Sequence, residues 1–164
     1  MIKFDLGESS LGCVLVACSE KGVCAISLGD DPDILVAWLL KKYPHAERNS
    51  EDTNLQQQLS LVLNYVEDPT RPLNIVLDLQ GTAFQKRVWQ ALQAVPNGAT
   101  SSYSDIAEAI GSPHAVRAVA GACAANPLAL AIPCHRVVSK DGSLSGYRWG
   151  VDRKKILLDR EAFR

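Results

Sequence analysis

Long apolar runs are missing from this 164-residue chain, which bears on where the protein works. No stretch approaches the roughly 18 consecutive apolar residues that a membrane-spanning helix requires. Residues 1–12 carry Lys3, Asp5 and Glu8, so they lack the apolar stretch of a secretory signal. We therefore expect a cytoplasmic protein that has no membrane partner.

Paired cysteines are missing too. The chain has five cysteines, an odd number, and no Cys-x-x-Cys pair. This pattern favours reduced thiols in a cytosolic protein over a disulfide framework. Cys13, Cys18 and Cys24 have neither the paired spacing of metal ligands nor a histidine close by, so we expect no metal site there.

Charge is almost balanced over the whole chain but not along it. The net charge is −1, yet residues 1–80 hold 6 basic against 12 acidic residues and residues 81–164 hold 11 against 6. Between positions 117 and 155 seven basic residues stand against two acidic ones. This asymmetry indicates an anionic partner for the second half, unless these residues form only a solvated basic face.

The first half of the chain is typical of a small α/β module. Short apolar runs broken by glycine predict strands, and apolar residues at every third or fourth position predict helices. The first helix should begin at Asp31-Pro32 and stop at Tyr43-Pro44. In order, we predict two strands, two helices and a last strand at 14–16, 23–28, 31–43, 55–66 and 75–79.

Helices dominate beyond Gly81-Thr82, so we expect two domains, 1–80 and 81–164, and the α+β class. Apolar periodicity and capping residues predict four helices in the second domain. They are one from Phe84 to Val95, a short one capped by Ser102, one from Ser112-Pro113 to about Ala125, and one capped by Asp152 that runs through Phe163. The middle two are separated by Gly111, which gives helix-turn-helix spacing.

The second helix of this pair has unusually small side chains. Residues 114–125 include alanines, Gly121 and Cys123, and only His114 and Arg117 could read base edges. Such a helix can approach either a neighbouring helix or a nucleic-acid groove closely. If it meets DNA, we expect little sequence preference.

Cys134 stands out because polar side chains interrupt an apolar, strand-like segment, Ile132-Pro133-Cys134-His135-Arg136-Val137-Val138. A thiol becomes a nucleophile only as a thiolate, and His135 could take its proton. Neighbouring side chains of an extended chain point to opposite sides, so a bend at Pro133 or a bridging water would be needed. Glu161, Asp141 or Asp159 could orient the histidine. The alternative is a buried unreactive thiol, which we expect for Cys13, Cys18, Cys24 and Cys123.

The second half resembles the O6-alkylguanine-DNA alkyltransferases, a family of DNA-repair methyltransferases. The resemblance depends on Pro133-Cys134-His135-Arg136-Val137, on Gly146-Tyr147-Arg148-Trp149-Gly150 and on the helix-turn-helix upstream, and runs from Gly81 to Glu161. The first half is similar, more loosely, to the ribonuclease-H-like module of that family. The fold implied is a small ribonuclease-H-like α/β module followed by a mainly helical domain.

The resemblance implies a role for each matching residue. Cys134 would accept the alkyl group, His135 would act as its base through a bridging water, and Glu161 would polarise His135. Guanine would be flipped out of the duplex, attacked once and irreversibly at its O6-alkyl carbon, and released as an anion. Residues implied in substrate binding or in bracing its pocket are Tyr103, Asn126, Val137, Arg148 and Lys154.

The family's partner is double-stranded DNA that contains O6-alkylguanine, entered through the minor groove. Arg117 would fill the space that the flipped base leaves. The implied DNA contacts are Gln85, Tyr103, Ser104, Ser112, Arg117 and Lys140. We expect a monomer that needs no cofactor and no metal.

Three other functions compete with this interpretation. A DNA-damage binder without chemistry would lack the acceptor cysteine, which this chain has. A helix-turn-helix transcription factor would carry more base-reading side chains. A thiol hydrolase would need an oxyanion hole and water access, which a sequence does not reveal.

Overall fold

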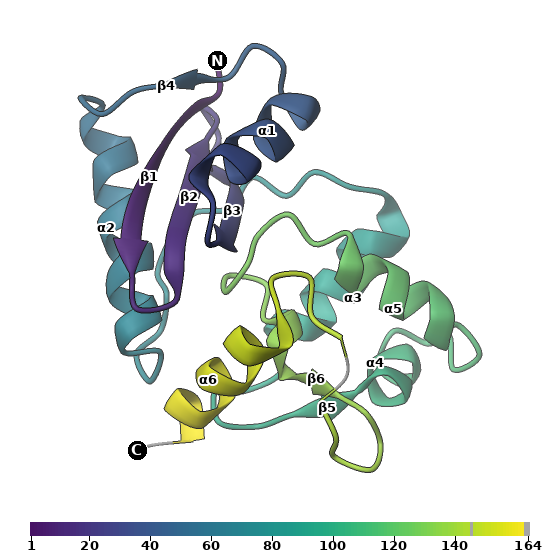
Figure 1. Cartoon of the computed structure of the whole chain (residues 1–164). Coiled ribbons are helices and arrows are strands. Elements are labelled where there is room, and N and C mark those ends of the chain that lie inside the picture. The colour runs from purple at the N-terminus through teal and green to yellow at the C-terminus, as the bar shows by residue number, and fades with distance from the viewer. Residues whose placement is uncertain (145, 163–164) are drawn as a thin grey trace. The chain divides into compact units, whose positions relative to one another are not determined.

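The computed structural model describes residues 1–144 and 146–162. The chain forms two compact units, Met1–Leu79 and Gln80–Arg164, and each is considered by itself. The first combines a mixed sheet with helices and the second is mainly helical, which confirms the α+β class (Figure 1). Within the described ranges, no helix combines the length and apolarity that a membrane span needs.

The first unit is built on a four-stranded sheet in the order β3-β2-β1-β4. β1 (Lys3–Ser9), β2 (Gly12–Cys18) and β3 (Val23–Gly29) pair antiparallel, and β4 (Glu47–Arg48) pairs parallel to β1. Nearly all of the central strand β2 is buried, because side chains on both of its faces are covered. Its sequence is therefore continuously apolar rather than alternating.

Two helices pack against this sheet. α1 (Pro32–Lys42) places Leu39 in a core with alternate residues of β2. α2 (Thr53–Glu67) lies against β1, where the Gln56 amide donates a 2.8 Å hydrogen bond to the Asp5 carboxylate. α1 begins where the sequence predicts and α2 begins two residues earlier, and in both an aspartate, at position 31 or 52, accepts the N-terminal capping bond.

The predicted strand at 75–79 is wrong. This segment pairs with β3 only at Val23, the first residue of that strand. The Val23 amide donates to the Val76 carbonyl and the Val23 carbonyl accepts from the Asp78 amide, both at 2.8 Å. One bridge is not a ladder, and the Val76 side chain remains 70% exposed. The segment is apolar enough for a strand but has no partner along its length.

The second unit contains α3 (Ala83–Gln93), α4 (Tyr103–Ala109), α5 (Val116–Ala124) and α6 (Val151–Ala162). α3 and α5 pack closely, and the buried Trp89 indole donates a 3.0 Å hydrogen bond to the Ala122 carbonyl. Both α3 and α4 begin with a capping box, in which the cap side chain and the third helical residue satisfy each other's backbone amides. These bonds fix where both helices begin.

α4 and α5 form the expected helix-turn-helix arrangement, with one boundary corrected. Gly111 makes the turn at φ +78°, a conformation open to glycine because it has no Cβ. The second helix begins at Val116 rather than at Ser112, so His114 lies in the turn and not on the helix. The Ser112 hydroxyl accepts a bond from Arg87 at 3.3 Å, and no side chain caps α5.

The last helix begins at Val151, two residues before the start that a cap at Asp152 predicts. Asp152 is the second residue of α6 and not its cap, although a carboxylate in the first turn still favours the helix dipole. Phe163, the predicted end of this helix, lies outside the described residues.

Candidate active site

Residues 132–138, called the acceptor segment because the resemblance makes Cys134 the alkyl acceptor, bend at their centre. Cys134–Arg136 form a 3-10 turn closed by a 2.9 Å bond from the Arg136 amide to the Pro133 carbonyl. The prediction of an extended segment is therefore wrong here, and the alternative of a bend at Pro133 is what the structure contains. Successive side chains in such a turn are about 120° apart instead of on opposite faces.

Beyond the turn, β6 (Val137–Val138) pairs parallel with β5 (Ser101–Ser102), the residues directly before α4. Ser102 belongs to this small sheet and also caps α4, because its hydroxyl oxygen accepts a 3.0 Å hydrogen bond from the Asp105 amide. The β5–β6 pairing therefore fixes the start of the helix-turn-helix relative to the acceptor segment.

Cys134 opens onto a cavity of about 280 Å³. The start of α4 contributes Tyr103, α5 contributes Ala120, Cys123 and Ala124, and the loop after β6 contributes Gly146, Tyr147 and Arg148. The thiol-bearing residue is only 5% exposed. A reagent must therefore enter the cavity to reach the sulfur.

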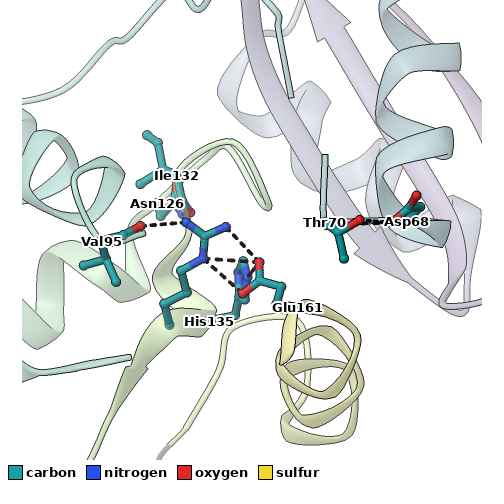
Figure 2. Close-up of polar contacts among 8 residues, drawn as sticks. Asp68, Thr70, Val95, Asn126, Ile132, His135 and Glu161 are labelled. Atoms are coloured by element: carbon teal, nitrogen blue, oxygen red, sulfur yellow. Dashed lines mark hydrogen bonds and ion pairs between the residues drawn. The ribbon is translucent and has the colours of Figure 1, made fainter. Parts of the chain in front are cut away.

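Asn126 is fully buried and holds the acceptor segment in place. Its Nδ2 donates to the Ile132 carbonyl at 2.9 Å (Figure 2). Nδ2 also donates to Cys134 Sγ at 3.3 Å, while Oδ1 accepts from the Leu128 amide at 2.8 Å. All three bonds lie within the stretch that connects α5 to the acceptor turn. The structure thus brings Asn126 to the position expected of a brace.

The Cys134 thiol is protonated at neutral pH. Burial raises its pKa to about 11, although the Asn126 hydrogen bond and the nearby Lys154 charge act in the opposite direction. A gap of about four pH units corresponds to roughly 5 kcal/mol for forming a free thiolate at pH 7. A base within the site must therefore take up the proton if this sulfur is to react.

His135 is a neutral base in this site. Its ring is fully buried, and burial lowers its pKa, against the opposing effect of the Glu161 hydrogen bond and charge. His135 Nε2 lies 3.0 Å from Glu161 Oε2 (Figure 2). A carboxylate only accepts hydrogen bonds, so Nε2 carries the proton and Nδ1 carries the lone pair. Nδ1 is buried and has no hydrogen-bond partner among the described residues.

Of the three candidate carboxylates, the structure brings only Glu161 to the histidine. Asp159 is instead paired with Lys155 on the surface at 2.7 Å, and Asp141 accepts bonds from Ser143. Burial alone would raise the pKa of Glu161, but the bonds from His135 and Arg136 more than offset it, so the pKa lies below its ordinary value. Glu161 is therefore ionised.

Arg136 is a part of this site that the sequence analysis missed. Its Nη2 donates to Glu161 Oε2 at 2.8 Å, Nε donates to Oε1 at 3.0 Å, and Nη1 donates to the Val95 carbonyl at 2.8 Å. The residue is 7% exposed. The available signal was its place directly after the cysteine and histidine, but we counted it with the basic surface.

Lys154, which the resemblance implies in substrate binding, is a second buried cation and is not part of an exposed basic face. It is 0% exposed, and its Nζ donates to the Val137 carbonyl. The charge acts on the thiols of Cys134 and Cys123, whose pKa values it lowers. With Arg136 and Lys154 inside the protein, the exposed basic surface is smaller than the residue count indicates.

The other residues expected to bind the substrate surround the cavity in different ways. Tyr103 and Arg148 line it directly, and Arg148 Nη1 also donates a 2.6 Å bond to the Asn126 carbonyl. Val137 is fully buried behind the acceptor turn and is held by Lys154.

The expected DNA contacts are spread over the helices of this unit and the loop after β6. Arg117 and Lys140 are exposed, on α5 and after β6, whereas Ser104 and Ser112 are half-buried near the two ends of α4. Gln85 is engaged in the capping box of α3, where its Oε1 accepts a 2.9 Å bond from the Thr82 amide.

A metal centre is not formed by the described part of the chain, where no three His, Cys, Asp or Glu side chains are grouped to hold an ion. The remaining cysteines are free and buried, as expected for Cys13, Cys18, Cys24 and Cys123.

Comparison with known proteins gives consistent matches. The family model described as 6-O-methylguanine DNA methyltransferase, DNA binding domain, matches residues 83–163. The bifunctional transcriptional activator/DNA repair enzyme Ada of Escherichia coli is 53% identical over 161 residues, which are 98% of this chain and 46% of that protein. The chain thus spans about half the length of the Ada proteins it matches.

Two further relatives are matched over most of their own length. The inducible methylated-DNA–protein-cysteine methyltransferase of Bacillus subtilis is 40% identical over 147 residues, covering 89% of this chain and 82% of that protein. The crystal structure of Mycobacterium tuberculosis OGT in complex with DNA superposes with a TM-score of 0.83 at 31% identity, over 98% of this chain and 92% of that one. A buried cysteine, its histidine and the fold around them agree with these matches, and the chain belongs to the family of methylated-DNA–protein-cysteine methyltransferases.

Proposed function

We propose that this protein repairs DNA by moving the alkyl group of O6-alkylguanine onto its own Cys134, once per molecule. The observation that carries the proposal is a buried thiol at a cavity, next to a neutral histidine whose Nδ1 is free to accept a proton. The cavity of about 280 Å³ lies at the small end of ligand pockets and suits a single base. A base inside a duplex must be flipped out to enter it.

The charges of the site suit a proton transfer from Cys134 to His135. Deprotonation leaves a thiolate near the Lys154 cation, and the protonated imidazole faces the Glu161 carboxylate, which Arg136 neutralises on its other side. Positive and negative groups then alternate through the site. Such fixed charges lower the cost of separating a proton from a buried thiol.

Alkyl transfer follows from the thiolate. The sulfur attacks the alkyl carbon, the bond from that carbon to O6 breaks, and the electron pair leaves with the guanine. The proton first taken up by His135 finally neutralises the departing base. A thioether with no hydrolytic route back remains on Cys134, so the protein acts as a stoichiometric reagent.

The exposed face of α5 supports an approach to DNA. Arg117, Ala118, Gly121 and Ala124 are exposed along one side of this helix. A Cβ added at Gly121 would meet no atom within 4 Å, so packing within the protein does not require a glycine there. Glycine inside a helix costs about 1 kcal/mol relative to alanine. Close contact with an external surface, here the minor groove, would account for it.

Intact-mass analysis tests the reaction. After incubation with a duplex that contains O6-methylguanine, we expect a gain of about 14 Da, mapped to the Cys134 peptide. The same duplex with ordinary guanine should give no gain. Retained DNA binding without any mass gain would contradict the proposal and favour a damage-binding protein without chemistry.

Gly121→Leu should separate DNA binding from chemistry. We expect the free energy of unfolding to rise by roughly 0.5–1 kcal/mol, because leucine favours a helix more than glycine does. The Kd for the duplex should rise about tenfold or more, as the side chain keeps the groove at a distance. Fluorescence anisotropy with labelled duplex and urea unfolding measure the two effects, and transfer from free O6-methylguanine should be unchanged.

Ala37→Leu on the exposed side of α1 is the matched control for this variant. It adds the same side chain to a helix of the other unit and should leave the Kd unaltered. Unchanged duplex affinity in Gly121→Leu would mean that this face of α5 does not meet DNA.

A further inference from the structure

Arg136 joins three parts of the second unit. It lies in the acceptor turn, donates to the Val95 carbonyl just after α3, and grips the Glu161 carboxylate of α6 with Nε and Nη2. Figure 2 shows the Glu161 carboxylate beside His135, with the Val95 carbonyl at the other end of this network. A planar guanidinium suits such a fork because its donors are fixed in one plane.

Glu161 needs this partner because its position in α6 is unfavourable for a carboxylate. It is the second-last residue of the helix, where the helix dipole repels negative charge and helices fray. It is also 0% exposed, so water does not solvate its charge. The neutral His135 supplies one hydrogen bond to Oε2, and Arg136 supplies the compensating charge.

The protonation state of His135 depends on the charges of Glu161 and Arg136. Arg136, Glu161 and a neutral His135 together carry no net charge. Without Arg136, the remaining buried pair is neutral only after it takes up a proton. That proton would occupy the base or the carboxylate that orients it, and coupled groups of this kind titrate as a unit.

We infer that Arg136 is a positioning residue for alkyl transfer, which holds Glu161 against His135 and keeps His135 unprotonated and ready to accept the thiol proton. The inference rests on the proposed function. Arg136 acts through Glu161 and His135 and does not contact the substrate.

Other charged and titratable groups near His135 also affect its protonation. Lys154 of α6 lowers the pKa of His135, as Arg136 does, whereas Glu161 raises it. Cys134 precedes it in the turn, and the Tyr147 ring lies edge-on with 6.4 Å between ring centroids. Lys154 Nζ donates to the Val137 carbonyl and its charge acts on the thiols of Cys134 and Cys123. It therefore does not substitute for Arg136 at Glu161.

The test is the pH profile of the single-turnover rate at saturating O6-methylguanine duplex. Arg136→Gln keeps a donor for Glu161 and removes the charge, so the acid limb of the profile should move up by about one pH unit or more. The rate at pH 7 should fall several-fold, by about tenfold if the limb reaches pH 8, and recover largely by pH 9. Arg136→Lys, which restores the charge without the fork, should have its limb between those of wild type and Arg136→Gln.

Arg48→Gln is the matched control, because Arg48 also pairs with a buried carboxylate, Asp5 at 2.9 Å, but in the first unit. It should lower stability without moving the pH profile. A folded Arg136→Gln protein with the wild-type profile overturns the inference. If Arg136→Gln does not fold, the inference is overturned by an Arg136→Lys protein whose acid limb lies at the same pH as that of the wild type. Failure of the proposed function is distinct, since the wild-type protein itself would then show no transfer.

Discussion

Cys134→Ala should abolish alkyl transfer completely while DNA binding persists. The variant removes the sulfur that lies within the cavity and leaves the exposed face of α5 untouched. No other group there can accept an alkyl carbon with the help of His135. Intact-mass analysis should show no gain on the protein, and the duplex Kd should match that of the wild type.

Cys123→Ala is the control that gives this result its meaning. Cys123 lines the same cavity, but burial raises its pKa to about 12, and it lies on α5 and not in the turn that carries His135. This variant should still become alkylated on Cys134. A mass gain in Cys134→Ala, on Cys123 or elsewhere, would show that the site does not select its acceptor as argued above.

Glu161→Gln should cause the second large loss. The amide keeps the shape of the carboxylate but removes the charge that stabilises a protonated His135 and that neutralises Arg136. The single-turnover rate should fall about 10²-fold to 10³-fold, in the range of general-base effects. Unfolding in urea should show a loss of about 3 kcal/mol or more, because Arg136 is left buried with an unpaired charge.

Asp159→Asn provides the comparison on the same helix. Its carboxylate pairs with Lys155 in solvent, where such ion pairs contribute little. Rate and stability should both stay within error of the wild type. If Glu161→Gln were as mild as Asp159→Asn, the buried network would have no role in the reaction.

Local signals in the sequence predicted most of the second domain. Thr82 and Ser102 stand before apolar periodic segments, and both cap the helices that follow. The turn glycine at position 111 has the backbone conformation for which glycine is suited. These features depend on neighbours within a few residues, which is why they could be predicted without knowledge of the fold.

Apart from helix boundaries and the bend at Pro133, the errors concern properties that depend on distant partners. The 75–79 segment has strand-like composition, but a strand also needs an edge to pair with along its length. The burial of Arg136 and Lys154 was not predicted, because sequence gives the sign of a charge and not its burial. The pairing of His135 with Glu161 spans 26 positions, and the residues alone favoured Glu161 without excluding Asp141 or Asp159.

The burial of the charged network has a consequence for how the protein would respond to ionic strength. Dissolved ions screen exposed charges over about 10 Å at 0.1 M salt but act little on groups enclosed by protein. Contacts between exposed residues such as Arg117 and DNA phosphates would weaken as salt rises. The proton transfer from Cys134 to His135, beside the Glu161 carboxylate, would take place inside the protein, where dissolved ions have little effect. Changes in the ionic conditions of the cell would then alter how often the protein engages DNA, and not how fast it reacts once a base is in place.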